Sequence, residues 1–256
     1  NNLLTLRLQH YVQWAGTSPV YGKLKSDFEA FIDVFTARKS SEIGTDGEIY
    51  NAVGNHLGTY LFDYQFKNPW GAFSLYHEHP FEDGSGTRFA NFPDGIWGVY
   101  FQPKESNFLN GFLYEFITTK DQSVGSVGYD NYFSNNVYRS GWSYERHIIG
   151  LPFMLIDPAV EITPLNSPIL SNRVVAHHFG LSGTFKKVAW TLKSSIVQNL
   201  SSYLQSETTN LHFWYNYLDL QYTTQDVGTF RAFGGLDTGN SLDTTAGLGL
   251  GYRYSF

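Results

Sequence analysis

The residues best suited to chemistry lie in one long link near the middle of the chain, residues 120–171. Its aromatic rings can pack on the C–H groups of a sugar, and its amide, carboxylate and guanidinium groups can bond the hydroxyls. A link of more than fifty residues is uncommon as a passive connection. The sequence therefore predicts glycan contact here. The candidate glycan-binding residues are Asp130, Asn131, Tyr132, Asn135, Tyr138, Arg139, Trp142 and Tyr144. For any single residue the alternative is a self-packed loop in which Asn and Asp form local turns.

Two histidines in an earlier segment raise the question of a metal site. His77 and His79 share one face of an extended strand, and Glu82 and Asp83 follow them. A third ligand for a cation is not evident. We therefore expect no metal here and interpret the segment as a polar strand end followed by a turn.

A second histidine pair raises the question of catalysis. His177 and His178 point to opposite faces of a predicted strand, with His178 turned inward. Ser182 lies on the same side as His178 but two strand steps away, too far for a hydrogen bond. The sequence therefore predicts no catalytic residue, no enzyme activity and no cofactor.

These residues are positioned by about ten segments in which apolar residues alternate with polar or small ones, the pattern of strands with one apolar face. No run approaches the roughly 18 apolar residues of a membrane helix, so membrane residence would require a β-barrel. The predicted strands cover residues 3–14, 58–66, 73–78, 97–102, 111–116, 175–182, 188–193, 214–222, 229–236 and 246–256.

The last of these strands shows the alternation best. Its even positions are Ala, Leu, Leu, Tyr, Tyr and Phe, and its odd positions begin with three glycines. One face suits lipid and the other a narrow or watery lumen, as in a transmembrane barrel strand with aromatic residues near the interface. A C-terminal Phe, here Phe256, resembles the assembly signal of bacterial outer-membrane proteins.

The links between the predicted strands alternate in length. Short turns are expected at residues 68–70, 102–107, 184–187 and 223–227, and long links at 16–55, 80–95, 120–171 and 200–210; only the link 237–242 breaks the pattern. Outer-membrane barrels place short turns in the periplasm and long loops outside. Ser26 and Glu29 form a capping-box pattern before Phe residues at helical spacing, which predicts a short external helix over 26–38.

Composition is consistent with this interpretation. Aromatic residues make up 18% of the 256 residues and charged residues 16%, and there is no Cys. The net charge of −6 argues against a nucleic-acid partner. A soluble β-sandwich, whose strands also alternate, is the competing fold.

The inward positions carry charges of both signs, which a barrel interior tolerates when they are paired or wet. These positions are Arg7, Asp63, Glu78, Glu115, Lys193, Asp219, Arg231 and Arg253. Whether they fill the lumen or line a pore stays open. The chain also enters its first strand by Leu3. Ten strands would close a small barrel or form the C-terminal part of a larger one, and we expect a single barrel domain over 1–256 that belongs to a longer protein.

Three stretches resemble a known family. They are Leu8-Gln-His-Tyr-Val-Gln-Trp-Ala-Gly-Thr-Ser-Pro-Val-Tyr-Gly-Lys23, Tyr76-His-Glu-His-Pro-Phe-Glu-Asp-Gly-Ser-Gly86, and residues 130–144 with Ile149-Gly-Leu-Pro152. Together they resemble the capsule assembly Wzi family, in a form typical of Bacteroidetes-like bacteria, from about residue 8 to residue 256.

The resemblance implies an antiparallel transmembrane β-barrel in the bacterial outer membrane that binds capsular or exopolysaccharide and helps attach it to the cell. Its implied partners are that polysaccharide, outer-membrane lipid and other outer-membrane proteins. Larger members of the family have more strands and an N-terminal helical part that this sequence lacks. A porin-like channel and a structural subunit of a larger outer-membrane complex are the alternatives.

Overall fold

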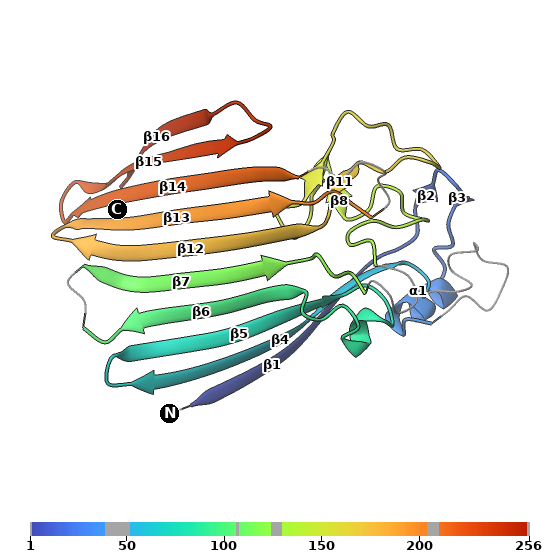
Figure 1. Ribbon diagram of the computed structural model, residues 1–256, viewed down its shortest axis with the longest axis horizontal. Coiled ribbons are helices and arrows are strands. Elements are labelled where there is room, and N and C mark those ends of the chain that lie inside the picture. The colour runs from blue at the N-terminus through green and yellow to red at the C-terminus, as the bar shows by residue number, and fades with distance from the viewer. Residues whose placement is uncertain (1, 39–51, 106–107, 124–129, 204–209, 255–256) are drawn as a thin grey trace.

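The computed structural model describes residues 2–38, 52–105, 108–123, 130–203 and 210–254 (Figure 1). Ten long strands form one antiparallel sheet in which each strand pairs with its neighbours along the chain. They are β1 (Leu3–Gln13), β4 (Asn55–Asn68), β5 (Gly71–Phe81), β6 (Gly95–Pro103), β7 (Leu109–Thr118), β12 (Val174–Phe185), β13 (Val188–Asn199), β14 (Leu211–Thr224), β15 (Gly228–Gly239) and β16 (Thr245–Arg253). No helix among the described residues is long and apolar enough to cross a membrane.

The remaining elements are short and lie in the links. They are β2 (Thr17–Ser18), β3 (Gly22–Lys23), α1 (Phe28–Phe35), η1 (Gly86–Arg88), β8 (Ser143–Tyr144), β9 (His147–Ile148), β10 (Leu155–Ile156) and β11 (Ile169–Ser171). The all-β class, the ten strands and the single short helix are therefore as predicted. The N-cap differs from the predicted capping box: the carboxylate of Asp27, not the hydroxyl of Ser26, accepts a hydrogen bond from the backbone amide of Ala30 at 2.8 Å.

The sheet is open. Among the described residues β1 pairs only with β4, and β16 pairs only with β15. The large antiparallel sheet is thus confirmed, whereas the closure into a barrel is not seen. Phe256, the residue that resembles an outer-membrane assembly signal, lies outside the described residues.

One face of the sheet, the apolar face, is formed by the even-numbered residues of β1 and their cross-strand partners. At one edge of the sheet Leu6 opposes Phe62, and at the other edge, on the same face, Ala232 opposes Leu250. A period of two keeps such residues on one side over the whole sheet. Among the described residues no second layer covers this face, and Leu248 is 96% exposed. The packed second sheet of a soluble sandwich is therefore not seen.

Aromatic rings flank this face at both ends of the strands. Near the short turns lie Phe66, Phe73, Phe101, Tyr222, Phe230 and Tyr252, with neighbouring rings 4.5–5.1 Å apart. Near the other end lie Tyr60, Trp97, Phe116 and Trp214. Between the two rows lie aliphatic side chains such as Leu75, Val99, Leu192 and Leu218, together with the rings of Tyr114 and Phe179 and the polar side chains of Ser194 and Asn216.

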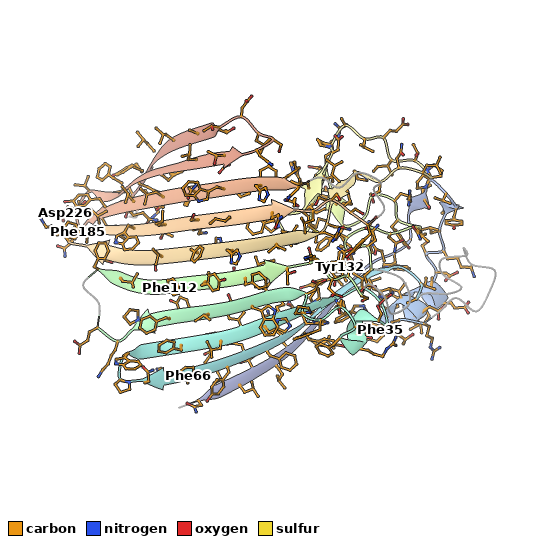
Figure 2. The ribbon with its side chains drawn as sticks, viewed as in Figure 1. Phe35, Phe66, Phe112, Tyr132, Phe185 and Asp226 are labelled. Carbon is orange, nitrogen blue, oxygen red and sulfur yellow. The ribbon has the colours of Figure 1, made fainter. Side chains whose placement is uncertain are left out.

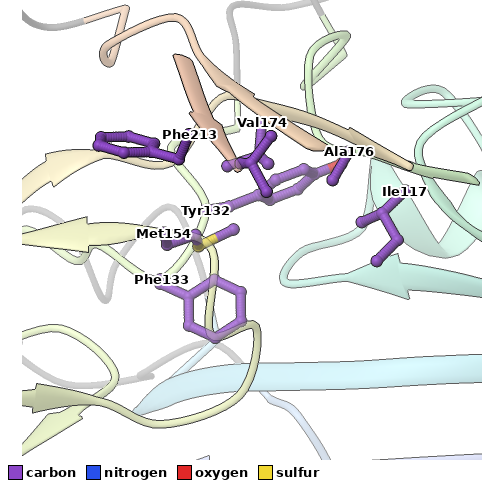
Figure 3. Close-up of a cluster of buried hydrophobic side chains, with 8 residues drawn as sticks. Ile117, Tyr132, Phe133, Met154, Val174, Ala176 and Phe213 are labelled. Carbon is purple, nitrogen blue, oxygen red and sulfur yellow. The ribbon is translucent and has the colours of Figure 1, made fainter. Parts of the chain in front are cut away.

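The opposite face, the polar face, is divided in two along the strands. Toward the long links, a lid of loop residues buries an apolar core against the sheet (Figure 3). The core consists of Ile117, Tyr132, Phe133, Met154, Val174, Ala176, Val197 and Phe213. We call this part the covered half. Toward the short turns the polar face carries mostly polar side chains, with Leu61, Leu113 and Phe233 among them, and we call that part the open half.

All the long links gather at one end of the sheet (Figure 1). We call the described part of them, residues 14–38, 52–54, 82–94, 119–123, 130–173 and 200–203, the loop head. The short turns lie at the other end, where Figure 2 labels Phe185 and Asp226. Trp70, in the turn between β4 and β5, and Phe185 are exposed. The predicted sorting of links by length is confirmed by this arrangement.

Candidate functional site

The interior of the loop head is held together by Tyr132, one of the predicted sugar-stacking residues. Its ring is 1% exposed and belongs to the covered core. Its hydroxyl accepts a hydrogen bond from Asn91 Nδ2 at 2.5 Å and donates to Asp94 Oδ2 at 3.0 Å. Both faces of the ring are thus occupied by protein, and the hydroxyl joins the link 119–173 to the link 82–94.

Asp94 is the acceptor at the centre of this interior. Its carboxylate is buried and accepts the backbone amides of Asp121 and Gln122 at 3.0 and 2.8 Å, besides the Tyr132 hydroxyl. Burial raises the pKa of Asp94 to about 6, although the hydrogen bonds oppose this shift. Burial and the nearby carboxylate of Asp94 also raise the pKa of Tyr132.

Asp130 and Asn131, two predicted hydrogen-bonding residues, also point into the loop head. Asp130 accepts from Ser123 Oγ at 2.7 Å and Ser85 Oγ at 3.1 Å, and burial raises its pKa. Asn131 Oδ1 accepts from Asn172 Nδ2 at 2.7 Å. Glu82, which receives the amide of Phe133 at 2.6 Å, likewise has a pKa raised by burial.

Asn135 shapes the loop rather than presenting its amide to solvent. Its Oδ1 accepts the amides of Val137 and Tyr138 at 2.8 and 3.0 Å, a local Asx-turn. Its Nδ2 donates to Asn55 Oδ1 at 3.2 Å at the start of β4. Tyr138 is itself buried. These two residues follow the self-packed alternative stated above.

The remaining three candidates lie nearer the surface. Arg139 is half-buried, and its Nε donates to the carbonyl of Thr163 at 3.4 Å. Trp142 packs one side against the covered core. Tyr144 is 68% exposed and lies in the β8–β9 hairpin opposite His147.

The turn of this hairpin carries backbone strain. Glu145 and Arg146 have φ values of 45° and 66°, a conformation that two-residue hairpins usually reserve for Asn and Gly. Non-glycine residues held there cost on the order of 1 kcal/mol each and cluster at functional sites. The turn places Tyr144 and Arg146 at the surface of the loop head.

A cleft of about 420 Å³ opens beside this turn. It runs between the hairpin and the segment that follows β10, and its volume lies in the range of small-ligand sites. Its polar lining comes from Ser143, Arg146, Asp157 and Glu161. The arrangement offers a guanidinium and two carboxylates to a ligand. Tyr144 follows Ser143 in β8 and is exposed, but it does not line the cleft.

Sequence reasoning found Tyr144 but missed the charged residues of this cleft. Residues 130–144 are rich in the aromatic and amide side chains that suit a sugar, whereas Asp157 and Glu161 lie in a Pro-containing segment with few such side chains. The available signal was the run Tyr144-Glu-Arg146, in which large polar residues stand between two short extended segments.

The open half of the polar face holds a second set of polar contacts. Tyr76 Oη donates to Glu115 Oε1 at 2.5 Å by crossing β6 at Gly98. A Cβ at Gly98 would overlap the Tyr76 ring, so this crossing requires glycine. Farther along, Arg231 forms an ion pair with Asp219. These charged residues share the polar face of the sheet, as the alternation predicted.

His178 has a partner that the sequence did not reveal. Its Nδ1 lies 2.7 Å from the Oγ of Ser195, which opposes it on β13, whereas Ser182 was the serine weighed above. Ser195 is buried, and the pair bridges two strands at the boundary between the covered and the open half. This contact is a cross-strand hydrogen bond of the sheet.

His77 and His79 lie in the ring row at the loop end of the apolar face. His77 stacks on Trp97 at 3.8 Å, and His79 stacks on Phe89 at 4.4 Å. Among the described residues no group of three or more His, Cys, Asp or Glu side chains is placed to hold a metal ion.

A second hollow, of about 580 Å³, is lined by residues of the four neighbouring strands β13, β14, β15 and β16. Its lining includes Leu220, Phe230, Ala232 and Leu250 of the apolar face. It therefore suits a hydrocarbon chain rather than a sugar.

No protein-family model, curated protein or solved structure matches this chain.

Proposed function

We propose that this chain forms the wall of a bacterial outer-membrane β-barrel and that its loop head binds capsular or exopolysaccharide at the cell surface. The observation that carries the proposal is the uncovered apolar face. Soluble proteins rarely expose contiguous apolar patches beyond a few hundred Å². Here exposed apolar side chains extend over the sheet from Leu4 in β1 to Leu250 in β16.

Lipid explains the composition of this face. Acyl chains would meet the aliphatic middle, and the interfaces would meet the two rows of rings, as in known membrane barrels. The polar links then lie on one side of the membrane and the short turns on the other. The resemblance to the capsule assembly Wzi family supports the outer membrane as the location and polysaccharide as the ligand.

Both edges of the sheet must then be paired, since an unpaired strand edge cannot face lipid. β1 runs toward the loop head and β16 runs away from it, so the two edges can pair antiparallel in a closed barrel. They can also pair with strands of another subunit, which is the structural-subunit alternative. Cysteines at successive apolar-face positions of β1 and β16 test this, because disulfides form within one chain in the first case and between chains in the second.

The cleft beside β8 and β9 is the proposed glycan site. Arg146 would bond hydroxyl or carboxylate groups of the sugar, and Asp157 and Glu161 would accept from hydroxyls. The exposed Tyr144, outside the cleft in the same hairpin as Arg146, would stack on a ring of the glycan that extends beyond the cleft. The buried Tyr132, Asp130 and Asn131 would act by holding the loop that carries the cleft.

Binding of purified capsular polysaccharide, measured by surface plasmon resonance, tests the site. Tyr144→Ala combined with Arg146→Ala should weaken binding by about tenfold or more. Trp70→Ala, which removes an exposed ring at the opposite end, should leave binding unchanged. Equal binding by the double variant and the unaltered protein would overturn this site.

A porin-like channel is the second candidate, because the open half presents exposed charged side chains such as Lys193 and Arg231. The lid over the covered half opposes it, since the lid fills the inward side near the loop head. Single-channel conductance distinguishes the two functions: steady conductance favours a channel, and its absence favours the glycan-binding wall.

A further inference from the structure

The helix α1 presents a ridge of aromatic rings to the outside of the molecule. Phe28 and Phe35 are 77% and 74% exposed, and Phe31 lies between them. Successive rings are stacked 6.2 Å apart, so the three form one continuous strip along the helix. Three exposed Phe side chains on an eight-residue helix are costly in water.

The other sides of the helix differ in chemistry. Ala30 and Val34, about a quarter turn or more from the ridge, are buried against the loop head. Glu29 and Asp33 form a third, acidic stripe on the side away from the rings. The stripe of Ala30 and Val34 therefore anchors the helix, the acidic stripe is hydrated, and the ridge of Phe side chains is wholly apolar.

The apolar ridge continues the apolar face of the sheet. Val12 belongs to that face and lies, with Val34, against Gly54. Trp14, two residues farther along, has its ring 6.0 Å from that of Phe31. Figure 1 shows α1 just beyond the loop ends of β1 and β4. The rings thus extend the face that the proposed function assigns to lipid.

From this continuity we infer that α1 is an interfacial helix, which inserts Phe28, Phe31 and Phe35 into the lipid leaflet on the loop side of the membrane. An amphipathic helix of this kind lies in the plane of the interface with its apolar side at the acyl boundary. The inference rests on the proposed function and adds a second membrane contact, through which the loop head touches lipid beside β1.

The chain has no cysteine, so a single spin label can be placed at any chosen position. Four variants of the intact protein are needed, each reconstituted in phosphatidylcholine vesicles: Phe31→Cys, Phe35→Cys, Asp33→Cys and Leu218→Cys. Collision of the label with oxygen, which concentrates in lipid, is compared with collision with a water-soluble nickel chelate. Leu218 lies in the aliphatic middle of the apolar face and reports on the wall itself.

Labels at Phe31, Phe35 and Leu218 should favour oxygen by several-fold over the label at Asp33. If Leu218 favours oxygen while Phe31 and Phe35 behave like Asp33, the wall is in lipid and the inference on α1 is wrong. If the labels at Phe31 and Phe35 are shielded from both reagents, a protein covers the ridge and the inference is also wrong. If Leu218 itself favours the nickel chelate, the membrane proposal fails, and the inference fails with it.

Discussion

The covered and open halves of the polar face are built by the same strands, yet their inward side chains differ sharply. The boundary follows the sheet from one strand to the next. Glu115 and His178 oppose each other on β7 and β12, and one inward step toward the loop head the pair becomes Ile117 and Ala176. On β13 the same step leads from Ser195 to Val197.

This difference shows that the polarity of a side chain on the polar face matches what covers it. Beneath the lid of Tyr132, Phe133 and Met154, apolar side chains lose water and gain contacts. Beyond the lid, polar side chains contact one another and water. In the open half each strand therefore has one polar and one apolar face. In the covered half both faces of the same strand are apolar.

The largest effect is expected from a charge placed under the lid. Val197→Asp would bury an unpaired carboxylate in the apolar core, which should lower the free energy of unfolding by about 4 kcal/mol. Ala189→Asp puts the same residue on the same face of β13 in the open half, where it should cost less than about 1 kcal/mol. Thermal unfolding in lipid vesicles measures both. Equal costs would show that the two halves do not differ.

Removal of the buried acceptor in the loop head comes next. Asp94→Ala leaves two backbone amides and the Tyr132 hydroxyl without an acceptor, at an expected cost of about 3 kcal/mol. The link 119–173 should then become sensitive to protease while the strands stay protected, because Asp94 joins links and not strands. Digestion followed by mass spectrometry locates the cuts; cuts confined to the short turns would contradict this role.

The pH dependence of the loop head should oppose the usual trend. Burial holds the pKa of Asp94 at about 6, above its ordinary value of 3.8, and it also raises the pKa values of Glu82 and Asp130. Because the folded state holds these protons more tightly than the unfolded chain, stability is greatest at low pH and falls as the pH rises through about 6.

For Asp94 alone this loss amounts to about 2 kcal/mol between about pH 4 and pH 7. Protease resistance of the link 119–173 across this range measures it. Asp94→Asn should reduce the slope of the profile, since an amide does not titrate, and the remaining slope belongs to Glu82 and Asp130. A resistance that increases with pH would reverse the assignment.

The two halves also differ in how far the sequence predicted them. Strand alternation placed Arg231, Asp219 and Glu115 inward, because a period of two depends only on neighbours in the chain. The sequence equally separated long from short links. It did not show that the lid lies over Ile117 and Val197, because that contact joins residues far apart in the chain.

The same reason explains the fate of the candidate site. Rings and amides beside one another in sequence suit either a sugar or a folded interior, and the structure uses Tyr132 and Asn135 for the interior. The cleft beside Tyr144 depends on a hairpin turn meeting the segment after β10, a distance of more than ten residues along the chain. Composition of a single stretch does not encode such a meeting.

The smallest effect is expected from the ion pair of the open half. Asp219→Ala separates Arg231 from its carboxylate, but the guanidinium stays partly exposed and can be hydrated, so the cost should be about 1 kcal/mol. Since Gln221 and Tyr217 also bond to Asp219, Gln221→Ala is the matched control for loss of a neutral hydrogen bond alone. Thermal unfolding at two salt concentrations separates the contributions, because salt screens only the charged pair. A cost near that of Asp94→Ala would mean that the open half is also sealed from water, and the distinction between the halves would fail.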